Sequence, residues 1–180
     1  MATLRKGSQK VCPVIISNEQ GIIITSNGSS STGFTLKSIN ITEVSAYQFM
    51  FNKFYQFGNI ITSVNFKSIK SISGGQAFAY AFQLTGVENA YFNNLQSLTG
   101  PGVFYYAFRS CPIEDIYFNS LTSTSFGSYT NQFNLMLDGV TGCTVHFPSN
   151  LQSVIGSWND VTTGFGGTNT TVLWDLSATT

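Results

Sequence analysis

Apolar and polar residues alternate in short runs along this chain, and the runs return at a fixed spacing. The sequence ITSVNFKSIKSI starts at position 61, VENAYFNNLQSL at position 87 and IEDIYFNSLTST at position 113, so successive copies are evenly offset. A longer copy, CTVHFPSNLQSVIG, starts at position 143. The columns that stay apolar are Ile61, Val87 and Ile113; Phe66, Phe92, Phe118 and Phe147; and Ile69, Leu95, Leu121 and Leu151.

A period in the twenties indicates one supersecondary unit stacked repeatedly, because a single unit cannot bury its own apolar face. Each copy opens with strand-like alternation, in which Val64 and Phe66 point one way and Asn65 points the other. The stretches AYAF and YYAF predict a short helical or 3₁₀ turn that brings Phe82 or Phe108 under the strands. The fold class predicted is therefore mainly β, a short solenoid of 25–29-residue repeats.

The repeat divides the chain into three parts. Residues 33–168 form about five rungs, which run roughly over 34–60, 61–86, 87–112, 113–142 and 143–168, and residues 169–180 are the expected C-terminal cap. Residues 1–32 do not fit the repeat. There, two β-branched runs at 11–16 and 21–25 predict a hairpin, followed by a Gly/Ser linker at 26–33. This N-terminal segment is too small for a core of its own and is expected to act as an anchor.

The composition supports a folded but weakly charged protein. Charged residues are 9% of the 180 and the net charge is zero, so no overall charge favours nucleic acid or a membrane. Seven of the eight basic residues lie in the first 70 positions, which gives that part +5 and the remainder −5. Two interpretations stay open. Either the charge asymmetry has no function and reflects drift in the residues at solvent-exposed positions, or the basic end binds an acidic partner and the other end faces outward.

Residues able to do chemistry are few. The three cysteines Cys12, Cys111 and Cys143 lack metal-ligand spacing, and Cys111 and Cys143 are expected to fill small buried positions. His146 is the only histidine, and we expect it to face solvent on a sheet. Glu114 and Asp115 are adjacent and cannot form a carboxylate pair on one strand face. The sequence therefore predicts no enzyme, no metal site and no cofactor.

The repeat does predict a flat sheet face with a recurring set of outward side chains. The candidate binding residues are Asn89, Tyr91, Asp115, Tyr117 and His146. Tyrosine combines apolar area with a polar hydroxyl, so this column is a candidate platform for sugar rings or a protein loop. The alternative is that the tyrosines only stabilise neighbouring strands. The candidate attachment residues lie near the N-terminus and are Arg5, Lys6, Lys10, Val11, Val14 and Ile15.

Two segments carry a resemblance to known proteins. VHFPSNLQSVIG at 145–156 and YYAFRSC at 105–111 resemble the BspA-like class of leucine-rich repeats, whose pattern is roughly LxxIxFPxxLxxIGxxAFxxC. The chain departs from that pattern where the middle copies lack proline and where SFGSYTNQFNLML replaces the AF tail. Proteins of this class are bacterial surface and secreted adhesins, which implies binding of protein or glycan.

The opening LRKGSQKVCPVI resembles the start of short head-fibre or decoration proteins of tailed gut phages, including the crass-like group. The opening residues lack the apolar stretch of a secretory signal, and no run reaches the length of a membrane span. Together these features predict a non-enzymatic structural and adhesive protein on a virion surface. Its expected partners are two further copies in a homotrimer, capsid proteins at the N-terminus and a host glycan or protein. The alternative is a bacterial cell-surface adhesin module.

Overall fold

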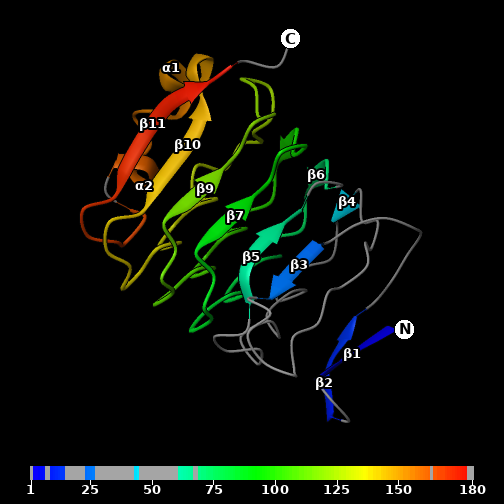
Figure 1. Ribbon diagram of the computed structural model, residues 1–180. Helices are drawn as coiled ribbons and strands as arrows, with labels where there is room; N and C mark the ends of the chain where they lie inside the picture. The colour runs from blue at the N-terminus through cyan, green and yellow to red at the C-terminus, as the bar shows by residue number, and fades with distance from the viewer. Residues whose placement is uncertain are drawn as a thin grey trace.

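The computed structural model describes four short strand segments, 2–6, 9–14, 23–26 and 43–44, and then residues 61–66, 69–162 and 164–177. Parallel strands stack in register along one side of the molecule, as Figure 1 shows. The strands of this main sheet are β3 (Ile23–Ser26), β5 (Ile61–Asn65), β7 (Asn89–Tyr91), β9 (Asp115–Tyr117), β10 (Thr144–Pro148) and β11 (Thr171–Leu176). Their order in the sheet is β11-β10-β9-β7-β5-β3.

The register of the main sheet reproduces the sequence repeat. Ser63 pairs with Asn89 and Asn89 with Asp115, so β5, β7 and β9 are offset by the same period as the apolar columns. All neighbours from β5 to β11 run parallel, whereas β3 adds to β5 in the antiparallel direction. Since each strand starts a new turn of the chain and pairs with the equivalent strand of the next turn, the predicted mainly β solenoid is confirmed.

A second, narrower sheet is formed by short strands that follow β3, β5 and β7 along the chain. It contains β4 (Glu43–Val44), β6 (Ser71–Ile72) and β8 (Ser97–Leu98), all parallel, and a bridge from Leu98 to Phe126 extends it. Neighbouring rungs approach closely just after these strands. A Cβ atom on Gly100 would lie 2.5 Å from the carbonyl oxygen of Gly74, so only glycine fits there.

The third side of each rung is a ladder of turns with an alternating hydrogen-bond pattern. In residues 76–84 the N–H groups of even-numbered residues donate to carbonyls of the next rung, as Phe78 does to Val103 at 2.9 Å. Odd-numbered residues donate within the rung, as Ala79 does to Gln76 at 3.0 Å. The 3₁₀-type bonds that the sequence predicts are therefore present, but only at alternate residues, because the other amides join the rungs together.

This alternation requires left-handed backbone conformations at every fourth residue. Gln76, Tyr80 and Leu84 have φ of 54°, 57° and 58°, and the equivalent positions of the next rung do the same. Those later positions are Gly102, Tyr106 and Ser110. Side chains at these positions point away from the core, while the phenylalanines between them point into it.

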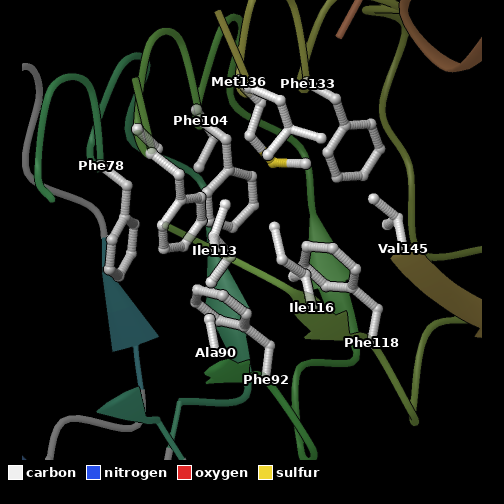
Figure 2. Close-up of a cluster of buried hydrophobic side chains, with 14 of the residues drawn as sticks. Phe78, Ala90, Phe92, Phe104, Ile113, Ile116, Phe118, Phe133, Met136 and Val145 are labelled. Atoms are coloured by element: carbon white, nitrogen blue, oxygen red, sulfur yellow. The ribbon is translucent and has the colours of Figure 1, made fainter. Parts of the chain in front are cut away.

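The core is a set of stacked rings between the strands and the turns. Phe66, Phe92, Phe118 and Phe147 are fully buried, with centroids 4.9–5.2 Å apart and planes within 13° of parallel. Phe82 stacks on Phe108 at 5.2 Å, as the repeat predicts. Figure 2 shows phenylalanines of the turn ladder, among them Phe104 and Phe133, lying across the core from the strand residues. Rings from the turns meet rings from the strands at 75° and 68°, the T-shaped arrangement that aromatic pairs favour.

The rung at 113–142 is longer than its neighbours but keeps the same plan. Leu95 and Leu121 are one regular period apart. Phe133 stacks on Phe104, but it lies three positions further along the chain than one regular period would place it. The additional positions therefore fall between Leu121 and Phe133, in a segment whose residues 127–131 are all exposed. The turn ladder resumes at Gln132, whose carbonyl accepts from Phe104 at 2.8 Å, so the irregular sequence does not break the stack.

Short helices and one further strand complete the C-terminal end. The 3₁₀ turn η2 (Ser149–Leu151) leads into α1 (Gln152–Ile155), and α2 (Asn159–Thr162) follows. β11, within the segment expected to be a cap, pairs parallel with β10 and carries Trp174. Trp174 stacks on Phe147 at 5.4 Å and so covers the end of the phenylalanine column.

The N-terminal strands pair differently from the prediction. The sequence suggested that the runs at 11–16 and 21–25 pair with each other. Instead β1 (Ala2–Lys6) pairs with β2 (Gln9–Val14), and β3 joins the edge of the main sheet. A two-residue connection favours the first pairing. On the edge of the main sheet β3 joins a structure that already has a core, whereas an isolated two-stranded hairpin is marginal in water.

Candidate functional site

The candidate binding residues from β7, β9 and β10 lie together on the outer face of the main sheet. Asn89 pairs with Asp115, and Tyr91 pairs with Tyr117, which in turn pairs with His146. The residues between them point inward: Ala90, Ile116 and Val145 are fully buried. The alternation predicted from the sequence therefore assigns the correct face.

The rings of the second row form a continuous stack. Tyr91 and Tyr117 lie 5.0 Å apart with planes 7° from parallel, and Tyr117 and His146 lie 4.3 Å apart at 11°. Each ring face inside the stack is covered by its neighbour, so a sugar ring cannot insert there. This observation favours the cross-strand stabilising role for the ring faces, and it leaves ring edges and hydroxyls for contact with a ligand.

The hydroxyl of Tyr117 remains a neutral donor over a wide pH range. Burial raises the pKa of this phenol, and the nearby charge of Asp115 raises it further. Asp115 and Asn89 lie in the adjacent row, so the face offers carboxylate, amide and phenol groups at the spacing of neighbouring strands. Such a row can hydrogen bond to a ligand that repeats along one direction.

His146 does not face open solvent, which corrects the expectation from the sequence. Only 9% of the residue is exposed, because carboxylates from two other strands enclose its ring. Nε2 lies 3.1 Å from Oδ1 of Asp115, and Nδ1 lies 3.0 Å from Oδ2 of Asp175. The alternation along the strand predicts the correct face for His146, but it does not show that the side chain of Asp175 on β11 contacts the ring.

The arrangement around His146 is structural in character. A neutral imidazole donates through one nitrogen only, whereas a protonated ring donates to both carboxylates. In either state both nitrogens are occupied, so neither is open to a substrate. Among the described residues, no group of three or more His, Cys, Asp or Glu side chains could hold a metal ion.

Asp175 is the site residue that sequence reasoning missed. The repeat pattern assigns this residue to the C-terminal cap, although TVLWDL at 171–176 alternates in the manner of a strand. That alternation puts Thr171, Leu173 and Asp175 on one face and could have identified the residue as an outer-face group. Its contact with His146 depends on the parallel pairing of β11 with β10, which the sequence does not reveal.

The attachment residues are placed only by their backbone. Arg5 and Lys6 belong to β1, and Lys10, Val11 and Val14 belong to β2. Arg5 is the cross-strand neighbour of Lys10, so the basic positions share the turn end of the hairpin. Ile15 lies outside the described residues.

Two of the three cysteines belong to the core, as predicted. Cys111 and Cys143 are buried and free. The Cys111 thiol donates to the carbonyl of Phe82 at 2.6 Å. Burial raises the pKa of both thiols, that of Cys143 to about 12, which makes them unreactive at neutral pH. Cys12 lies in β2.

Comparisons with known proteins do not supply a function. In the part of the chain that the structure describes, no helix is long and apolar enough to cross a membrane. Searches against protein-family models, curated proteins and solved structures give no match to this chain.

Proposed function

We propose that the chain is a non-enzymatic structural and adhesive protein of a virion, in which the N-terminal hairpin attaches to the particle and the solenoid faces outward. The observation that carries this proposal is the combination of a rigid, regularly spaced polar face with a hairpin that pairs separately. Among the described strands, β1 and β2 pair only with each other, whereas β3 to β11 belong to the solenoid sheets.

The outer sheet face supports an adhesive role because its side chains are held in place. Tyr91 and Tyr117 are fixed by stacking, and Asp115 is fixed by His146. Groups on strands above a close-packed core keep their spacing, which favours binding of a ligand with repeated hydroxyl or amide groups. A host surface polysaccharide or a repetitive protein loop has this character.

The basic positions of the hairpin support the attachment role. Arg5, Lys6 and Lys10 would steer the hairpin toward an acidic surface of a capsid protein, and its strand edges can add to a neighbour's sheet. A two-stranded hairpin is marginal by itself, so docking on a partner or association in a homotrimer would stabilise it.

The second candidate is a bacterial cell-surface adhesin module of the BspA-like leucine-rich repeat class. The segment at 145–156 favours it, because its match to that repeat pattern runs through β10, η2 and α1. Both candidates use the solenoid for binding and differ in what the N-terminal part joins.

Deletion of the hairpin tests the proposal. Removal of residues 1–14 keeps β3, which pairs with β5, so the shortened chain should remain soluble and folded by circular dichroism. It should no longer co-purify with phage particles assembled in its presence, whereas the full chain should. As a matched control, Thr171→Ala on the distant strand β11 should co-purify normally.

Normal incorporation of the shortened chain would contradict the attachment role of the hairpin. Recovery of the full chain in cell envelopes rather than in particles would contradict the virion role and support the adhesin module instead. The mass of the full chain in solution, measured by light scattering, tests the expected trimer separately.

A further inference from the structure

A second cluster of aromatic and charged side chains lies on the turn ladder, across the core from the main sheet. Tyr80 stacks on Tyr106 with centroids 5.2 Å apart, and Tyr105 lies 4.3 Å from Tyr106 at 65°. The guanidinium carbon of Arg109 lies 5.1 Å from the centroid of Tyr106. Arg109 Nε lies 2.9 Å from Oδ2 of Asp138, so the cluster ends in an ion pair.

The backbone of the turn ladder does not require tyrosine at these positions. Tyr80 and Tyr106 have left-handed φ, which glycine adopts at lower cost, as Gly102 and Gly139 do in the neighbouring columns. Tyr105 occupies the position of Ala79 one rung earlier, which is small and fully buried. The three tyrosines are instead only partly buried, so part of each side chain reaches the surface.

The ion pair in the cluster is distinctive for this chain. Arg109 is the only basic residue after position 70. Its side chain is 42% exposed and that of Asp138 is 34% exposed, so both reach solvent while they bind each other. A surface that places its one cation over a tyrosine and beside a carboxylate concentrates donors, acceptors and aromatic area in one place.

We propose that Tyr80, Tyr105, Tyr106, Arg109 and Asp138 form a binding site for a neutral saccharide. Tyr105 lies outside the stack of Tyr80 on Tyr106 and offers apolar area to the C–H groups of a sugar ring. The hydroxyls of the stacked rings, the guanidinium and the carboxylate offer donors and acceptors to the hydroxyls of the sugar. This inference rests on the proposed adhesive function and assigns the sugar contact to the turn ladder rather than to the stacked rings of the sheet.

The charges of the cluster favour a neutral sugar over an acidic or basic one. A sialic acid, uronic acid or sulfated sugar would have to displace Asp138 from Arg109, and a cationic sugar would have to displace Arg109 from Asp138. Either exchange leaves one charge without its partner. The phenol of Tyr106 also remains neutral, because its hydrogen bond with Tyr105 and, after that, burial raise its pKa.

Binding of the full chain to an array of neutral and acidic oligosaccharides tests the proposal. The array should carry mannose, glucose, galactose and N-acetylhexosamine oligomers beside sialylated, uronic and sulfated ones. We expect binding to a neutral oligomer that changes little with salt. Tyr105→Ala and Tyr106→Asn should each weaken it by about tenfold or more, since central aromatic contacts dominate such sites. Asparagine tolerates the left-handed backbone, and circular dichroism checks the fold.

The matched control is Tyr129→Phe, at a tyrosine that is 48% exposed in the long loop and belongs to neither candidate face. It should bind the same oligomer as the unaltered chain does. Tyr117→Phe, which removes only a hydroxyl from the sheet face, reports on that alternative site. If Tyr117→Phe loses binding and the turn-ladder variants keep it, the saccharide site is on the sheet, so this inference is wrong and the adhesive function stands. The inference is also wrong if the chain binds no neutral saccharide, or if it binds only acidic saccharides or a protein. Failure of the full chain to join particles or cell envelopes would instead overturn the proposed function itself.

Discussion

At the scale of single residues, the phenylalanine column provides most of the specific packing. Phe92 contacts Phe66 and Phe118 in its own column and Phe78 and Phe104 from the turns, and none of its surface is exposed. Each ring thus joins three rungs. A solenoid has no contacts between distant rungs, so these nearest-neighbour contacts determine its cooperativity.

Truncation of this column should be costly. We expect Phe92→Ala to lower the free energy of unfolding by about 3–5 kcal/mol, because it removes a buried ring and leaves a cavity. Denaturant unfolding measures the change. Tyr129→Ala, at a side chain that is 48% exposed in the long loop, is the control and should change the value by about 0.5 kcal/mol or less. Equal effects of the two variants would show that the repeat register is wrong.

The buried thiol of Cys143 should make stability depend on alkaline pH. Burial raises its pKa from 9.0 to about 12, so the unfolded chain loses this proton at lower pH than the folded chain does. The stabilising contribution is complete below about pH 9 and is lost as the pH rises toward 12. Cys143→Ala should therefore lose less stability than the unaltered chain between these values in denaturant titrations. Parallel pH curves for the two proteins would contradict the assignment.

At the scale of elements, a rung satisfies its backbone N–H and C=O groups in two different ways. The sheets pair strands directly, whereas the turn ladder sends alternate amides to the next rung and keeps the others within the turn. The second arrangement requires left-handed residues, which explains why non-glycine residues such as Leu84 adopt positive φ at a solvent-exposed position. Rungs of unequal length stack because the extra residues fall between core positions, in the longest rung between Leu121 and Phe133, which both stay fully buried.

The contact between Asp175 and His146 should help to hold β11 on the sheet. Asp175→Ala removes one partner of a bridge that spans β9, β10 and β11, and amide hydrogen exchange in residues 171–176 should become faster. Because the Asp175 side chain is 45% exposed, the global loss of stability should be on the order of 1 kcal/mol or less. Thr171→Ala on the same strand is the control. Unchanged exchange in Asp175→Ala would show that the strand is held by backbone pairing alone.

At the scale of the whole molecule, burial decreases from the central rungs toward the C-terminal end. Phe92 and Phe118 have rings on both sides, while Val172 and Trp174 are only partly buried against the last rung. In a stacked architecture the end units have one neighbour and the central ones have two.

Native-state hydrogen exchange should therefore be graded along the solenoid. We expect the amides of β7 and β9 to exchange only through global unfolding, and those of β11 to exchange through local opening at lower free energy. Mass spectrometry of proteolytic fragments from increasing denaturant would measure the gradient. Uniform protection from β5 to β11 would mean that the rungs unfold as a single cooperative unit.

The period, the apolar columns and the face of each strand can be predicted from the residue pattern alone, because side-chain direction in a strand alternates and a repeated unit must bury the same positions. This pattern located the phenylalanine core, the buried cysteines and the outward position of Tyr91 and Tyr117 in this way. The three-dimensional structure is needed for the geometry of side chains across rungs and for the pairing of segments outside the repeat. Examples are the stack that covers the tyrosine faces, the enclosure of His146 by Asp175, the pairing of β3 with β5 and the cluster around Tyr106. The period aligns equivalent positions of regular rungs, but how their side chains pack and how the other segments pair depends on the whole fold.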